Sequence, residues 1–428
     1  MGTDIGASAD MGSGANGGAD GSAPLLAAVR TGDASLVKRI LVGQRIDSDW
    51  VDDAFRLALA TRSGTIAQLL LHSGADPGRC RPDELPSLRE AVESGSPVLV
   101  EVLLGPGIRD RYDESELPAM RDLARQLHET GVETRLRRLT GSRDDLVRAR
   151  VQNGEWDSVD AYSLGGMTVR DGYAAILTDL EYLLGERTSF EELMARALGH
   201  DQQHVSWGTA TILLANRRDP ETWAAAAALR THAEPSHRLF GAEVLRLTHL
   251  FDDSDEEVFT DPARELFIDW STREEDVAVL TEVLVALGEH CDPRTVAALL
   301  PLAAHHDSGV RCAVAGGCRT WPKPPAFPDD VRAALLALMA DVDAEVRRAA
   351  CLTVAEGGDR HPALADAMAA LVDDADRQVR VKAVCGLALH DDERCVEAKR
   401  RLPPAPPGTP YEYDLDEVLR YELRRDGR

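Results

Sequence analysis

Aromatic residues, lysine and paired cysteines are all scarce in this sequence. Aromatic side chains make up 5% of its 428 residues, so alanine and leucine supply most of the apolar content. This composition favours closely packed helices over a thick sheet core. The seven cysteines are odd in number and contain no C-x-x-C pair, which argues against a disulfide framework. They are expected to be small buried residues in a reducing cytoplasm, with Cys312, Cys351 and Cys385 inside apolar stretches.

Long apolar runs and sorting signals are also lacking. No stretch of about 18 apolar residues is present, so no membrane-spanning helix is expected. The N-terminus has no charged segment followed by an apolar one, and Gly6 stands where a myristoylation motif needs serine or threonine. The sequence therefore predicts a cytoplasmic protein that does not bind membranes.

Basic residues are fewer than acidic residues, which gives a formal net charge of −25. A surface of this sign repels nucleic-acid phosphates and anionic membranes. The expected partner is another protein, and a basic one would suit the charge. Solubility alone also explains the acidity.

The recognisable motifs of catalysis are absent. The sequence has no G-x-x-x-x-G-K-[ST] phosphate loop, no G-x-S-x-G elbow and no cysteine with a histidine partner by motif. Gly165-Gly166 lacks the preceding strand that a dinucleotide site requires. We therefore expect no catalytic residues, no cofactor and no enzymatic activity.

A first periodicity runs through the N-terminal part. The pattern L-x-x-A-x-x-x-G recurs with glycine steps of 32 and 31 residues. Leucine and alanine three apart share one helix face, and glycine readily ends a helix. The three copies are Leu25, Ala28 and Gly32; Leu57, Ala60 and Gly64; and Leu88, Ala91 and Gly95.

These copies resemble the ankyrin repeat. Ala23–Ala28 and Pro86–Ala91 stand where that family has T-P-L-H-x-A, and Gly74–Pro77 is similar to the loop after its second helix. The family's histidine is replaced by leucine in the first copy and by arginine in the other. The resemblance implies ankyrin-like helix pairs over residues 23–140.

A second, more regular periodicity occupies the C-terminal half. The pattern D-x-x-V-R recurs with valines 36 and then 33 residues apart. Aspartate there caps a helix, valine turns into the core, and arginine can pair with an aspartate of the next repeat. This pattern resembles HEAT repeats, including those of the phycobilisome-lyase type. The copies begin at Asp307, Asp343 and Asp376, and weaker ones near Asp201, Glu234 and Asp276.

The predicted fold is therefore all-α: an α-solenoid of ankyrin-like helix pairs followed by a HEAT-like superhelix. Between the arrays, an amphipathic run from Tyr173 and a capping box at Ser189 predict two joining helices. The predicted segments are a disordered Gly-rich leader at 1–22, ankyrin-like repeats at 23–140, a helical connector at 141–195, HEAT-like repeats at 196–401, and a Pro-rich linker with a short C-terminal helix at 402–428.

Three polar clusters contain residue types that bind metals. His200 and His204 have the i, i+4 spacing of zinc peptidases, but Asp201 as a helix cap would place His200 before the helix. His305-His306 lies in a turn and lacks further ligands. The run Asp252–Glu257 lacks the glycine of a calcium loop, and contact with a basic partner is its alternative role. A structural interpretation is favoured for all three, so no metal is predicted.

Tryptophan is enriched in binding hot spots, so its positions are informative. Trp207 and Trp223 lie in alanine- and leucine-rich helices and are expected in the core. Trp156 and Trp321 lie in loops and are the better candidates for contact with a partner. The expected function is a protein–protein interaction scaffold or adaptor that binds through an extended solenoid surface. The alternatives are a lyase-like or chaperone-type HEAT protein acting on a modified protein or chromophore, and a HEAT-type nucleic-acid enzyme, which the acidity disfavours.

Overall fold

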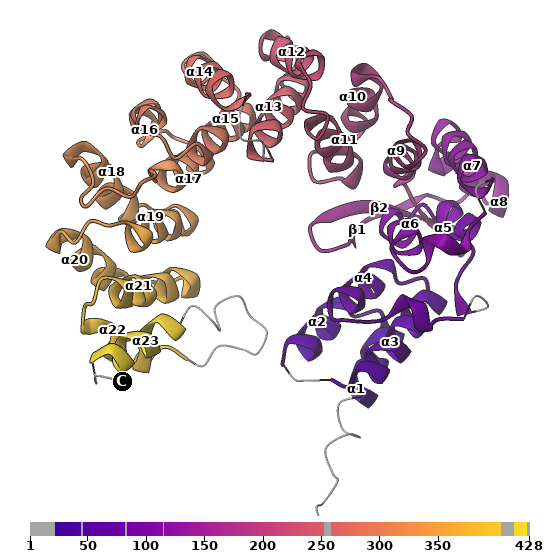
Figure 1. The fold of residues 1–428 in the computed structure, drawn as a ribbon, viewed down its shortest axis with the longest axis horizontal. Coiled ribbons are helices and arrows are strands. Elements are labelled where there is room, and N and C mark those ends of the chain that lie inside the picture. Colours follow the sequence, from indigo (N-terminus) through magenta and orange to yellow (C-terminus); the bar gives the residue numbers. More distant parts are fainter. Residues whose placement is uncertain are drawn as a thin grey trace, which may run out of the picture. The chain divides into compact units, whose positions relative to one another are not determined.

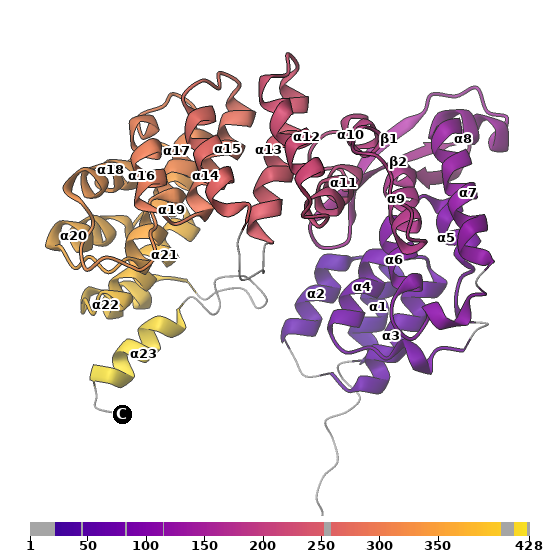
Figure 2. The ribbon, with the colours of Figure 1, turned by 45° about the horizontal axis from the view of Figure 1, so that its top comes forward.

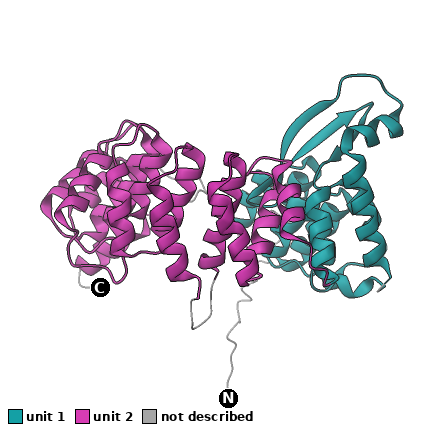
Figure 3. Cartoon of the chain, turned by 90° about the horizontal axis from the view of Figure 1, so that it is seen from above, with its two compact units in different colours: residues 1–184 teal, residues 185–428 magenta. Residues whose placement is uncertain are grey.

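The computed structural model separates into two compact units, which are described one at a time (Figure 3). Unit 1 is Met1–Leu184 and unit 2 is Gly185–Arg428. The predicted leader up to residue 21, the acidic run Asp252–Glu257 and the prolines beyond Pro403 lie outside the described residues. The described residues are 22–43, 46–81, 84–113, 115–251, 258–403 and 415–425.

Unit 1 consists of helix pairs and one small sheet (Figure 1). Its helices are α1 (Ser22–Thr31), α2 (Ala34–Gly43), α3 (Ser48–Ala60), α4 (Gly64–His72), α5 (Leu88–Ser94), α6 (Pro97–Leu104), α7 (Glu116–Thr130), α8 (Val132–Thr140) and α9 (Tyr173–Leu183). α1 packs on α3, α4 packs on α6, and α7 lies between α5 and α9. Their apolar faces form one continuous core, as a repeat array requires.

One helix end of the first periodicity differs from the prediction. Gly32 and Gly95 adopt left-handed φ values of 73° and 67°, as expected of glycines that end a helix. In the middle copy Arg62 takes this conformation, with a φ of 55°. Gly64 instead begins α4, where a Cβ would lie 2.8 Å from the backbone nitrogen of Leu99. The prediction for Gly64 is therefore wrong: close packing against α6, and not helix termination, requires glycine there.

The all-α prediction is wrong within the segment predicted to be a helical connector at 141–195. Strands β1 (Val147–Asn153), β2 (Asp157–Leu164) and β3 (Met167–Arg170) form an antiparallel sheet there in the order β1-β2-β3. Leu164 pairs with Met167 across the two-residue turn Gly165-Gly166. Both glycines have positive φ, 55° and 81°, which is the conformation that tight hairpin turns demand. These glycines, which break up a helical pattern, are therefore the turn of a hairpin.

Unit 2 is an array of paired helices in two rows (Figure 2). In one row α11, α13, α15, α17, α19 and α21 pack each on the next, and the intervening helices pair along that row. Helix α23 packs on α21 and buries Val418 and Tyr421, so it covers the end of the core. The helices are α10 (Phe190–Leu198), α11 (Val205–Ala215), α12 (Pro220–Ala228), α13 (Pro235–Leu250), α14 (Thr260–Ser271), α15 (Val277–Glu289), α16 (Pro293–Leu299), α17 (Ser308–Gly317), α18 (Asp329–Met339), α19 (Ala344–Glu356), α20 (Pro362–Leu371), α21 (Arg377–Leu389), α22 (Arg394–Arg401) and α23 (Asp416–Arg425).

The predicted helix caps of the second periodicity are confirmed. Asp307, Asp343 and Asp376 each accept hydrogen bonds from the backbone N–H groups two and three residues further on. Asp276 caps α15 in the same way. The valine three residues after each cap is fully buried, as predicted; these are Val279, Val310, Val346 and Val379.

The caps of the weaker copies do not follow the prediction. Helix α11 begins at Val205, and its cap is His204, whose Nδ1 accepts a hydrogen bond from the Ser206 N–H at 3.2 Å. Asp201 therefore does not cap this helix. Glu234 stands at the cap position of α13 but makes no cap hydrogen bond through its side chain.

The seven cysteines are all free. Cys351 is buried, as predicted, and burial raises the pKa of its thiol to about 12. Cys312 and Cys385 are only half-buried. Among the described residues, no helix is both long and apolar enough to cross a membrane.

Helices α15 and α17 meet backbone to backbone at Gly288 and Gly317. A Cβ on Gly288 would lie 2.7 Å from the Cα of Gly317. We expect Gly288→Ala to lower the free energy of unfolding by about 1.5 kcal/mol, because the two helices would have to separate. Gly316→Ala is the matched control: its Cβ would meet nothing within 4 Å, and it should raise stability by about 0.5 kcal/mol. Urea unfolding followed by circular dichroism measures both, and equal effects of the two changes would contradict the prediction.

Candidate functional site

Arginines link successive repeats of unit 2, as the sequence predicts. Arg311 donates two hydrogen bonds to Asp341, at 2.7 and 2.8 Å, and Arg347 donates two to Asp374, both at 2.8 Å. The acceptor lies two residues before the capping aspartate of the next repeat and is not the cap itself. The hydrogen bond from Arg311 lowers the pKa of Asp341, and Arg347 does the same for Asp374.

Each of these arginines also holds its own loop. Nη1 of Arg311 donates to the carbonyl oxygens of His305 and His306, at 2.9 and 3.0 Å. Nη1 of Arg347 donates to the equivalent carbonyls of Asp341 and Val342, at the same distances. We call each arginine, its two carbonyls and its acid partner a rung. A rung satisfies loop carbonyls and fixes the spacing of neighbouring repeats at once.

The repeat that begins at Asp276 has no rung among the described residues. In the repeat that begins at Asp276, Leu280 stands where the other repeats have arginine. In the next repeat, His305 stands where the others have an acid, and its Nδ1 accepts a hydrogen bond from the Asp307 N–H at 3.2 Å. The arginine and its partner are therefore replaced together, and the backbone N–H that the acid would bind is still satisfied.

The third rung, formed by Arg238 and Glu274, has an additional partner. Glu274 accepts two hydrogen bonds from Arg238, at 2.8 and 3.0 Å, and one from the Trp270 indole Nε1, at 2.9 Å. It also accepts from the backbone N–H groups of Glu275 and Asp276. Burial alone would raise the pKa of Glu274, but the hydrogen bonds from Arg238 and Trp270 lower it below its usual value.

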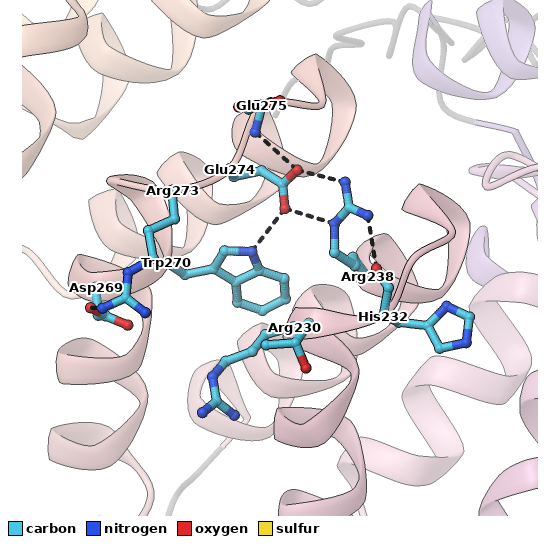
Figure 4. Close-up of a pocket in the computed structure, with 9 residues that line it drawn as sticks. Arg230, His232, Arg238, Asp269, Trp270, Arg273, Glu274 and Glu275 are labelled. Carbon is cyan, nitrogen blue, oxygen red and sulfur yellow. Dashed lines mark hydrogen bonds and ion pairs between the residues drawn. The ribbon is translucent and has the colours of Figure 1, made fainter.

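A pocket of about 280 Å³ opens at this third rung (Figure 4). In Figure 4 the Trp270 indole lies in the middle, with Arg273 to its left, Arg238 to its right and Arg230 below it. Arg230 and Arg273 are exposed, whereas Trp270 is buried. We call this the Trp270 pocket. Its lining residues are Arg230, Thr231, His232, Arg238, Asp269, Trp270, Arg273, Glu274 and Glu275.

Sequence reasoning missed the Trp270 pocket, although a signal for it was present. When the three rungs are aligned on their acids, Trp270 lies four residues before Glu274, where the other two rungs have Ala337 and Ala370. A tryptophan at a position where the other repeats have alanine indicates that this repeat differs locally from the others. The known motifs for catalysis contain no such pattern, because the lining residues come from two separate parts of the chain.

A wider hollow of about 510 Å³ lies on unit 1. Its arginines are both ion-paired: Arg56 with Asp53, and Arg62 with Glu90 at 2.7 Å. The guanidinium groups there are thus already engaged with protein carboxylates.

Both histidine clusters lie in loops, directly before helices α11 and α17. His200 and His204 stack with ring centroids 3.8 Å apart, and neither lies inside a helix, so the i, i+4 geometry of a zinc peptidase is not formed. Nδ1 of His204 is occupied as the cap of α11. His305 and His306 lie in the predicted turn, where their carbonyl oxygens bind Arg311.

The tryptophans divide largely as the sequence predicts. Trp207 is buried, and Trp223 is half-buried and stacks on Phe259 with centroids 6.3 Å apart. Trp156 and Trp321 are 88% and 74% exposed.

Comparison with known proteins identifies no family for this chain. No family model matches the chain, and no curated protein matches it. The crystal structure of YibA from Escherichia coli is similar, with 17% sequence identity and a TM-score of 0.41, over 51% of this chain and 77% of that one. A likeness this weak carries no argument about function.

Proposed function

We propose that this protein is a cytoplasmic scaffold that binds another protein through its repeat surfaces. In this proposal, residues 23–140 form ankyrin-like repeats and residues 196–401 form HEAT-like repeats. The support for HEAT-like repeats is the frame of unit 2, in which capping aspartates, buried valines and arginine rungs recur in successive repeats. A frame of this kind leaves the surface side chains free to vary for recognition.

The observation that carries the proposal is that each unit exposes a tryptophan on a firmly held loop. Trp321 donates its backbone N–H to the Cys291 carbonyl at 2.8 Å. Further along the same loop, Phe327 is buried and donates its N–H to Asp359 at 3.0 Å, and Arg332 donates to the Phe327 carbonyl at 2.9 Å. The loop is thus fixed at both ends while the Trp321 indole remains in solvent.

The turn that carries Trp156 in unit 1 is held similarly. Lys38 on α2 bonds to Glu155 at 2.5 Å, and the Gly154 N–H donates to the Thr65 hydroxyl at 3.2 Å. Exposing a large apolar ring costs free energy in water unless a partner covers it. A rigid exposed tryptophan loses little conformational entropy on binding, which is the property of a hot spot.

The charge of the chain indicates the kind of partner. With a net charge of −25, association with a basic protein would be accelerated by electrostatic attraction and would weaken as salt is added. We therefore expect the partner to have a basic surface around the pockets that receive the two tryptophans.

We expect Trp156→Ala and Trp321→Ala to weaken retention of the partner by at least about tenfold each, equivalent to about 1.4 kcal/mol. The full-length protein is immobilised, exposed to native lysate, and the retained proteins are quantified by mass spectrometry. Val342→Ala is the matched control, since Val342 is 94% exposed in a loop of unit 2 and no hot-spot role is assigned to it.

The proposal fails if the same proteins are retained by wild type and both tryptophan variants. It also fails if no protein is retained while a metabolite screen shows turnover. Because both tryptophans are exposed, circular dichroism of the variants should match wild type, which separates loss of binding from loss of fold.

A further inference from the structure

We propose that the Trp270 pocket of unit 2 binds a carboxylate, with the apolar stem of the ligand resting against the Trp270 indole. The inference rests on the proposed function in one respect, namely that a partner protein carries this carboxylate. The ligand chemistry itself follows from the hydrogen-bonding capacity left over in the pocket.

The acid within the pocket has no capacity left for a ligand. The Glu274 carboxylate accepts five hydrogen bonds, from Arg238, Trp270 and two backbone N–H groups. A carboxylate offers about four lone-pair sites, so a ligand cation or donor finds none of them open. Arg238 is equally engaged, because its other nitrogen donates to the His232 and Ala233 carbonyls at 2.9 and 3.0 Å.

Arg230 has donors to spare. Its guanidinium makes one hydrogen bond, from Nη1 to the Ala227 carbonyl at 2.9 Å, and no ion pair in the described part of the chain. Arg273, which also lines the pocket, pairs with Asp269 through one nitrogen, Nη2. A guanidinium carries five N–H donors, so the unmet capacity of Arg230 and Arg273 is for an acceptor.

None of these extra groups is required to build a rung. In the Arg311 rung the positions of Arg230, Trp270 and Arg273 are filled by alanine, and the rung still forms, with hydrogen bonds of 2.7 and 2.8 Å. In the Arg347 rung they are filled by methionine, alanine and aspartate. The fold accounts for Trp270, which is buried in the core against Phe267, but a rung requires neither Arg230 nor Arg273. Ligand binding gives these two arginines a role. The replacing residues are Ala303, Ala337 and Ala340 in one rung, and Met339, Ala370 and Asp373 in the other.

Size and charge favour a carboxylate over a phosphate. A volume of about 280 Å³ is at the lower end of ligand pockets and accommodates one side chain or a small fragment. The rim also carries Asp269 and Glu275, which would repel the nearly double charge of a phosphate. Among the arginines that line the pocket, Arg230 is the one without a carboxylate partner in the described residues. Its single positive charge matches the single negative charge of a carboxylate.

The test uses the full-length protein and three small probes. Phenylacetate has the required charge and stem, phenylacetamide has the stem alone, and inorganic phosphate is a more highly charged anion. By isothermal titration calorimetry we expect phenylacetate to bind with a Kd of about 1 mM, which is typical of a fragment of its size. Phenylacetamide and phosphate should bind at least about tenfold more weakly.

Arg230→Ala restores the residue found at the same position of the Arg311 rung and should weaken phenylacetate binding about tenfold or more. Arg400→Ala, an exposed arginine on α22, is the control and should leave binding unchanged. Equal binding of phenylacetate and phenylacetamide, tighter binding of phosphate, or undiminished binding by Arg230→Ala would each overturn the assignment.

The source of the carboxylate is tested separately. A peptide ending in a phenylalanine carboxylate should compete with phenylacetate, and the same peptide with a C-terminal amide should not. If phenylacetate binds and the peptide does not compete, the ligand is a free small acid and the protein-borne part of the inference is wrong. These measurements do not involve Trp156 or Trp321, so the scaffold proposal and the pocket can fail independently.

Discussion

Replacing Arg347 with methionine is expected to lower the free energy of unfolding by about 3 to 5 kcal/mol. The guanidinium and its partner Asp374 are 14% and 8% exposed, and two hydrogen bonds of 2.8 Å join them. The substitution leaves the Asp374 carboxylate buried beside a neutral side chain and also removes the donors to the Asp341 and Val342 carbonyls. Because this rung joins α19 to the loop before α21, its removal should destabilise the whole of unit 2.

The neighbouring residue supplies the control. Arg348 pairs with Glu345 on the surface of the same helix, so Arg348→Met should change stability by no more than about 0.5 kcal/mol. Chemical unfolding in guanidinium chloride, followed by circular dichroism, measures both variants. Comparable losses for the two would mean that the rungs contribute no more than ordinary surface ion pairs.

Acidification is expected to destabilise unit 2 through His290, by about 2 kcal/mol between pH 7.5 and 5. The His290 ring stacks on His249 with centroids 3.9 Å apart, and both of its nitrogens are buried with no hydrogen-bond partner among the described residues. Burial, together with repulsion from His249 and Arg264, lowers the pKa of His290 to about 3, although Asp292 and Asp261 act weakly in the other direction.

The sign follows from proton binding in the two states. Unfolded His290 binds a proton near its usual pKa of about 6.5, whereas the folded ring stays neutral down to about pH 3. Between these values the unfolded state holds more protons, so stability is complete above pH 6.5 and falls as the pH drops toward 3. Partial exposure of the ring lets solvent reduce the effect at the acidic end.

His290→Phe keeps a flat ring against His249 and removes the proton site. Its unfolding free energy should therefore depend less on pH than that of wild type, by about 2 kcal/mol over the same interval. His306→Gln, at an exposed histidine of unit 2, should leave the wild-type profile unchanged. Parallel pH profiles for wild type and His290→Phe would contradict the assigned environment. Comparing profiles, rather than single values, also removes any constant packing effect of the substitution.

The sequence predicts the frame of unit 2 because its signals are local. An aspartate that binds N–H groups two and three residues ahead, and a valine that turns inward one helical turn later, need no distant partner to be recognised. The same reasoning fails in the middle copy of the unit 1 repeat, whose glycine does not end a helix. The left-handed residue that ends α3 is Arg62, and Gly64 is required by a helix that is distant in sequence.

The repeat pattern alone therefore determined the helix pairs of unit 2, the aspartate caps at Asp276, Asp307, Asp343 and Asp376, and the pairing of arginines with acids of the next repeat. Only the tertiary structure decided which acid each arginine meets, because the choice between a capping aspartate and the residue two before it depends on how neighbouring repeats pack. It also decided the sheet at 147–170. A strand is stabilised by pairing with other strands, and a helical repeat pattern does not predict that pairing. The Trp270 pocket likewise depends on the tertiary structure, because residues 230–238 and 269–275 are apart in the sequence and only packing places them around one space.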